Sequence, residues 1–125
     1  MLDKNNLNNI HFAYSICKKF KISDKKIFNS LNKFKGLKFR NQIIYKKNNL
    51  LIINDSKSTT FSSTVGLLYS YSNIFWIVGG KYKKGDKLNL KRKYPKNIKA
   101  YIIGTNRKFF TNQLKHKIES RYFGS

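Results

Sequence analysis

A continuous apolar run at residues 74–78 ends in two glycines and constrains the fold of this chain more than any other feature. A second apolar run, residues 98–103, ends at Gly104, and a helical pattern of apolar residues precedes the first run. Strands that alternate with helices favour right-handed crossovers onto a largely parallel sheet. Strands that are apolar throughout also favour burial of both faces. The sequence therefore predicts an α/β fold with a largely parallel, Rossmann-like sheet and flanking helices.

The amino-terminal part of the chain has a different pattern. Residues 6–20 carry apolar side chains at steps of three and four, which predicts a helix. Ser23 as the cap and Gly36 as the end bound a second predicted helix. Residues 42–45 and 50–53 are short β-prone runs that predict a hairpin. The change in pattern near Gly36 indicates a domain boundary.

The remaining elements are predicted from the same periodicities. A helix is expected after residues 54–60, running through Val65 and Tyr69, and another from Asn106 to about Glu119. Residues 81–97 are expected to form a basic loop that contains some structure, whose type the sequence does not define.

The net charge of +22 has two interpretations. Lys and Arg total 27 against five acidic residues, so the surface would attract any polyanion. The chain is also rich in Lys, Asn, Ile, Phe and Tyr, the residues that adenine- and thymine-rich codons specify. Codon drift is the favoured explanation, and a small basic nucleic-acid-binding protein without enzymatic activity stays open as the alternative.

Cysteine and histidine usage limits the compartment and the chemistry. Cys17 is the single cysteine, which excludes an intramolecular disulfide and favours a reducing cytoplasm. No signal peptide is recognisable, and the longest apolar run is far below the roughly 20 residues that span a bilayer. His11 and His116 lie outside any Cys/His cluster, which argues against a zinc site. We expect a cytoplasmic protein without membrane insertion and without a metal site of its own.

The loop at residues 54–60 concentrates reactive side chains between a strand and a helix. Backbone N–H groups at a helix start, with nearby hydroxyls, can bind an anion. Lys57 adds a positive charge, and Asp55 could orient a metal-bound phosphate or a ribose hydroxyl. Ordinary helix capping by Ser58 or Thr59 explains the same residues equally well.

Two further loops are expected at the same edge of the sheet, because ligands of such folds bind beyond the carboxyl ends of the strands. Residues 79–86 combine glycines with Lys83 and Lys84, and residues 104–107 follow the second apolar run. A solvated basic turn is the simpler interpretation of residues 79–86. The spacing of a phosphate-binding P-loop occurs nowhere in the chain.

Four segments, in this order, resemble the Mur ligase family. Asn5–Asn9 is similar to the HNxxN segment of its central ATPase domain, and Phe34–Arg40 resembles the FxGLPHR junction into its carboxyl-terminal domain. Asn54–Thr60 is similar to NDSKATN, the signature of the branch that adds D-glutamate. Ile77–Gly80, with the lysines after it, resembles the following LGGxxK segment.

The chain departs from the family pattern at several positions. Asn5 stands where the family has His, Lys38 and Phe39 replace Pro-His, and Thr60 replaces the last Asn of NDSKATN. The P-loop and the UDP-substrate domain of the family are absent, as is its SPAxASFD stretch. We therefore expect a chain that is truncated at both ends and inactive by itself.

The resemblance implies a function and a domain organisation. Residues 1–35 would be the last helices of the central ATPase domain, and residues 36–125 a truncated carboxyl-terminal, D-glutamate-binding domain. The complete enzyme would join D-glutamate to UDP-N-acetylmuramoyl-L-alanine in peptidoglycan synthesis, through an acyl phosphate, with ATP and Mg²⁺. Its missing amino-terminal and central domains would be the partners of this chain.

The resemblance also assigns roles to residues. Lys57 would be catalytic and would bind D-glutamate together with Thr59 and Lys83, with Lys84 as an alternative to Lys83. The nucleotide would be bound by Asn6, Asn9, Arg40 and Asp55.

Overall fold

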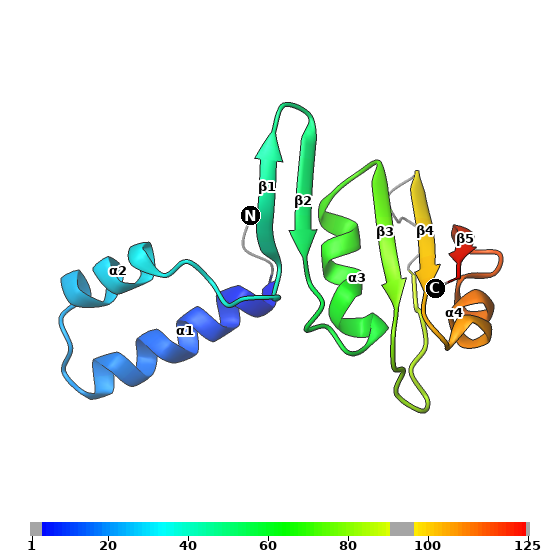
Figure 1. Ribbon diagram of the computed structural model, residues 1–125. Helices are drawn as coiled ribbons and strands as arrows, with labels where there is room; N and C mark the ends of the chain where they lie inside the picture. Colours follow the sequence, from blue (N-terminus) through cyan, green and yellow to red (C-terminus); the bar gives the residue numbers. More distant parts are fainter. Residues whose placement is uncertain (1–3, 91–96, 125) are drawn as a thin grey trace. The chain divides into compact units, whose positions relative to one another are not determined.

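The computed structural model of the chain describes residues 4–90 and 97–124, with the side chains of residues 4–6 left out. The chain divides into two compact units, Met1–Lys38 and Phe39–Ser125. Figure 1 shows the elements of each unit along the chain. No helix among the described residues is long and apolar enough to span a bilayer.

The first unit is a pair of helices, α1 (Lys4–Lys19) and α2 (Asp24–Lys33). The rings of Tyr14 and Phe28 pack with their centroids 6.2 Å apart and so join the two helices. Ser23 occupies the cap position of α2, but its side chain makes no capping hydrogen bond. The prediction that Gly36 ends this helix is wrong, because the helix already ends at Lys33 and Phe34 is extended.

The second unit begins with the predicted hairpin of β1 (Gln42–Lys47) and β2 (Leu50–Asn54). The strands pair antiparallel, with an irregularity in register between Ile43 and Tyr45. Asn48 makes the tight turn with a φ of 52°, a left-handed conformation that asparagine tolerates better than most residues.

The predicted α/β fold is confirmed by a three-stranded parallel sheet with the order β3-β4-β5. Its strands are β3 (Ile74–Gly79), β4 (Ile98–Ile103) and β5 (Glu119–Phe123). Helix α3 (Phe61–Ser70) precedes β3, and α4 (Arg107–Leu114) connects β4 to β5.

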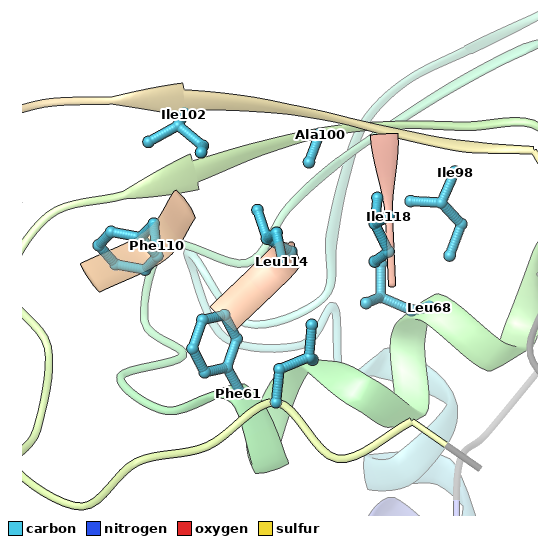
Figure 2. Packing of buried hydrophobic residues seen from close by; sticks show 9 residues of the cluster. Phe61, Leu68, Ile98, Ala100, Ile102, Phe110, Leu114 and Ile118 are labelled. Carbon is cyan, nitrogen blue, oxygen red and sulfur yellow. The ribbon is translucent and has the colours of Figure 1, made fainter. Parts of the chain in front are cut away.

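The core lies between this sheet and the two helices. In Figure 2 the side chains of β4 point toward those of α3 and α4. Burial of apolar surface from water is the main force that holds these layers together. The buried cluster consists of Phe61, Leu68, Leu88, Ile98, Ala100, Ile102, Phe110, Leu114 and Ile118.

The prediction that β3 is buried on both faces is wrong. Ile74, Trp76 and Val78 pack against the core, whereas Phe75 and Ile77 are 72% and 68% exposed. Successive side chains of a strand point to opposite faces, and α3 and α4 contribute to the cluster on one face. An apolar run therefore did not require two covered faces here.

The predicted last helix is also too long. Helix α4 ends at Leu114, and His116 adopts a left-handed φ of 62°. The chain turns there, buries Ile118 in the core, and continues as β5 beside β4. Residues 91–96 of the predicted basic loop lie outside the described residues.

Candidate functional site

Three loops of the second unit come together through hydrogen bonds. Loop 54–60 leads into α3, where the backbone N–H of Phe61 donates to a carboxylate oxygen of Asp86 (3.0 Å) in loop 79–86. The side-chain amide of Asn106, in loop 104–107, donates to the carbonyl of Gly80 (2.8 Å). Contrary to expectation, loop 54–60 follows β2 of the hairpin and not a strand of the parallel sheet. It is linked to loop 79–86 through Phe61, the first residue of α3.

Asp55 organises loop 54–60 from inside. Its Oδ2 accepts a hydrogen bond from the Ser58 hydroxyl at 2.5 Å, and its Oδ1 accepts one from the backbone N–H of Asn41 at 3.1 Å. The backbone N–H of Ser58 also donates to the Asp55 carbonyl at 2.9 Å, which closes a turn. Charge-assisted hydrogen bonds of this kind are stronger than neutral ones. Asp55 therefore holds the loop in shape.

The segment that carries Arg40 is held against this loop on both sides. The backbone N–H of Lys57 donates to the carbonyl of Phe39 at 3.0 Å, and Asn41 donates to Asp55. Phe39 has a left-handed φ of 66°, which is uncommon for a bulky residue. Arg40, Asp55 and Lys57 are thus brought together by backbone contacts, with the side chains of Arg40 and Lys57 exposed.

Helix α3 is capped by residues other than those considered from the sequence. The hydroxyl of Thr60 accepts a hydrogen bond from the N–H of Ser63 at 3.4 Å, and Asp86 accepts the one from Phe61. Ser58 instead bonds to Asp55, and Thr59 is exposed. Two N–H groups of the expected anion site are therefore already bonded to the protein itself.

We call residues 81–86 the lysine turn. The backbone N–H of Asp86 donates to the carbonyl of Lys83 at 3.1 Å, and Gly85 between them has a φ of 82°. That left-handed conformation suits glycine, which has no Cβ to clash. The side chains of Lys83 and Lys84 are exposed.

The remaining candidate residues are less connected. Asn9 is exposed on α1 in the first unit, and the side chain of Asn6 lies outside the described residues. Among residues 4–90 and 97–124, no three His, Cys, Asp or Glu side chains gather as a metal site would require.

Sequence reasoning missed Asp86 and Asn106. Asp86 is one of only five acidic residues and stands directly after a cluster of lysines and Gly85. The available signal was a single acid directly after a cluster of lysines, because such an acid often has a defined hydrogen-bond or ion-pair partner. Its partner Phe61 lies 25 residues away in sequence, so the pairing itself was not readable.

Curated relatives cover most of this chain, whereas no family model matches it. It is 35% identical over 114 residues to the UDP-N-acetylmuramoylalanine–D-glutamate ligase of Wolbachia sp. subsp. Brugia malayi, which covers 91% of the chain and 23% of that protein. The ligases of the same name from Rhizobium meliloti and Rickettsia prowazekii are 40% and 34% identical, over 79% and 91% of the chain and 21% and 26% of their own lengths.

The chain thus spans about a quarter of the length of the relatives that it matches. These comparisons give no support to the nucleic-acid-binding alternative.

Proposed function

From the premise that this chain is a relative of the UDP-N-acetylmuramoylalanine–D-glutamate ligases, we propose that it is the carboxyl-terminal part of such an enzyme. The complete enzyme joins D-glutamate to UDP-N-acetylmuramoyl-L-alanine in the cytoplasm during peptidoglycan synthesis. Met1–Lys38 would be the end of the central ATPase domain, and the second unit would be the D-glutamate-binding domain. The observation that carries this proposal is the 35% identity along 91% of the chain.

The reaction requires an activated carboxylate and a held amine. ATP, used with Mg²⁺, transfers its terminal phosphoryl group to the carboxylate of the UDP-linked substrate, which gives an acyl phosphate and releases ADP. The amine of D-glutamate then attacks the acyl carbon, and the tetrahedral intermediate collapses to the amide and phosphate. A domain that holds D-glutamate contributes by orienting that amine and by excluding water.

The charge of the loops supports a D-glutamate site. D-Glutamate has two carboxylates, and Lys57 and Lys83 are exposed cations that can pair with them. Thr59 is exposed and can donate a hydrogen bond from its hydroxyl, and Lys84 could replace Lys83. Lys57 comes closest to a catalytic residue in this scheme because it would contact the reacting amino acid.

The nucleotide would lie near the segment of Arg40 and Asp55, with Asn6 and Asn9 as further contacts. Arg40 can bind phosphate oxygens with its exposed guanidinium. Asp55 already accepts hydrogen bonds on both oxygens, so it fits the role of ordering the loop better than that of binding metal. Among the described residues, no group of three His, Cys, Asp or Glu side chains offers a second metal-binding candidate. Mg²⁺ is commonly held by substrate phosphates together with one or two carboxylates. The rest of the enzyme would supply these carboxylates.

Stereochemistry provides the test. We expect D-glutamate, titrated into the ¹⁵N-labelled 125-residue chain, to shift the amide resonances around Lys57 and Lys83 more than L-glutamate does. Lys57→Ala should weaken the apparent affinity for the D isomer roughly tenfold, as loss of one charged hydrogen bond predicts. Lys47→Ala, at an exposed lysine of β1, is the matched control and should leave the affinity unchanged.

Equal responses to the two isomers, including no response to either, would contradict the proposal. We expect no turnover by the chain alone, which a phosphate-release assay with ATP and UDP-N-acetylmuramoyl-L-alanine would check.

A further inference from the structure

The lysine turn is tied at both ends to one group of aromatic side chains. At its start, the ring of Tyr82 stacks on Phe109 of α4, with centroids 4.0 Å apart and an interplanar angle of 12°. Phe109 in turn stacks on Phe61 of α3 at 6.0 Å. At the other end of the turn, Asp86 accepts the hydrogen bond from the Phe61 N–H. Both ends therefore depend on Phe61.

Phe61 is a rigid anchor. It is 4% exposed and also packs edge-on against Trp76 and Phe110. A side chain that is buried in a close-packed core moves little, because a shift would open a void. The lysine turn, which contacts Phe61 through Asp86 and through Phe109, is therefore held in a fixed position.

The carboxylate of Asp86 is directed to the helix and not to the lysines. It is half-buried at the amino end of α3, where the helix dipole and the Phe61 N–H, which has no partner within the helix, both favour a negative charge. Among the described residues, Asp86 forms no ion pair with a lysine. The ammonium groups of Lys83 and Lys84 are therefore not neutralised by the one acid in their own turn.

We propose that Asp86 is a positioning residue that fixes the lysine turn on α3 and so presents Lys83 to an anionic ligand. This inference rests on the proposed function, since Lys83 belongs to the same D-glutamate site. A turn that is already ordered loses less conformational freedom when the ligand binds, which raises affinity without a new contact to the ligand.

Three variants of the chain test this role. Asp86→Ala removes the acceptor of the Phe61 N–H, and Asp86→Asn keeps an acceptor oxygen without the charge. Lys83→Ala removes the proposed ligand contact and leaves the anchor in place. Amide hydrogen exchange at Phe61, ¹⁵N relaxation of residues 83–85 and D-glutamate titration are measured on each, with the amides of Ile102 and Leu114 as a report on the core.

Asp86→Ala should accelerate exchange at Phe61 about tenfold, the loss expected for a helix cap, and increase the mobility of residues 83–85. Its affinity for D-glutamate should fall roughly threefold to tenfold as the ordering cost returns. Asp86→Asn should bring the exchange at Phe61 and the affinity for D-glutamate most of the way back to the wild-type values. If the alanine variant does not fold, the asparagine variant can still be compared with the wild-type chain. Lys83→Ala should lose affinity with unchanged exchange at Phe61.

Failure of this inference differs from failure of the proposed function. If the wild-type chain shows no preference for D-glutamate, the proposed function is overturned whatever Asp86 does. If the wild-type chain prefers the D isomer and Asp86→Ala binds it equally well with an ordered turn, the positioning role is overturned. An asparagine variant that folds but is as weak as the alanine variant would also count against it.

Discussion

At the scale of single residues, Gly79 is the position where the sheet tolerates no side chain. A Cβ built there would lie 2.1 Å from the backbone carbonyl oxygen of Ile103, its partner in β4. Backbone atoms of a paired strand cannot move aside without breaking the ladder. Gly79→Ala should therefore destabilise the second unit by about 2 kcal/mol or more, measured by urea unfolding.

Gly66, in the middle of α3, is the matched control. A Cβ there would meet nothing within 4 Å, and the residue has no left-handed φ. Gly66→Ala should stabilise the unit by about 0.5–1 kcal/mol, because alanine restricts the unfolded chain and favours the helix. Equal losses of stability in both variants would show that the close approach at Gly79 has no energetic consequence.

At the scale of elements, Asp24 connects the two helices of the first unit. It accepts a hydrogen bond from the Tyr14 hydroxyl at 2.9 Å and pairs with the Lys18 ammonium at 3.0 Å, both on α1. The hydrogen bond from Lys18, followed by that from Tyr14, holds the pKa of Asp24 below its ordinary value. The hydrogen bond that the Tyr14 hydroxyl donates to Asp24 raises the pKa of Tyr14.

This arrangement predicts that the contact between the two helices weakens in acid, by a modest amount because Asp24 is largely exposed. A carboxyl group whose pKa is lower in the folded state stabilises that state fully above its unfolded pKa, about 4 for aspartate. The stabilisation disappears as the pH falls through the lower folded value. The proximity of the Tyr14 and Phe28 rings, followed by NMR between pH 6 and 2, should therefore decline in that window.

Asp24→Asn is the control for this titration. The variant should show weaker contact between the rings at neutral pH and little change on acidification. A wild-type contact that persists unchanged to pH 2 would mean that Asp24 does not hold α1 to α2.

At the scale of the whole molecule, the net charge of +22 works against compactness. The ion pairs among the described residues join Lys18 to Asp24 and Glu119 to Lys99 and Arg121, and all of these side chains are at least 44% exposed. Exposed pairs of this kind add little stability. Repulsion between like charges should therefore outweigh attraction.

Added salt should stabilise this protein. Raising NaCl from about 0.01 M to 0.15 M shortens the screening length from about 30 Å to 8 Å. We expect the melting temperature, measured by circular dichroism, to rise by about 2–5 °C as the repulsion is screened. KCl should act equally, since the effect depends on ionic strength. A melting temperature that falls with salt would show that the few ion pairs dominate.

Much of the candidate site was readable because its residues are close in sequence. Residue types alone singled out the loop with Asp55 and Lys57, whereas the assignment of Thr59 and Lys83 to a D-glutamate site came from the family resemblance and stays a prediction. What the sequence did not reveal was how they are held. Asp55 bonds to Asn41, 14 residues away, and Asp86 bonds to Phe61. Hydrogen bonds between distant residues leave no periodic pattern.

The sequence by itself determined the local elements of this protein, because periodicity and turn residues report on neighbouring residues. It determined the helices, the hairpin, and the two apolar strands that end in glycine. Only the tertiary structure decided that β3 is covered on one face, since an apolar side chain does not specify its partner. Tertiary contacts also decided that the chain turns after Leu114 and forms β5, because pairing with β4 and burial of Ile118 outweighed helical continuation.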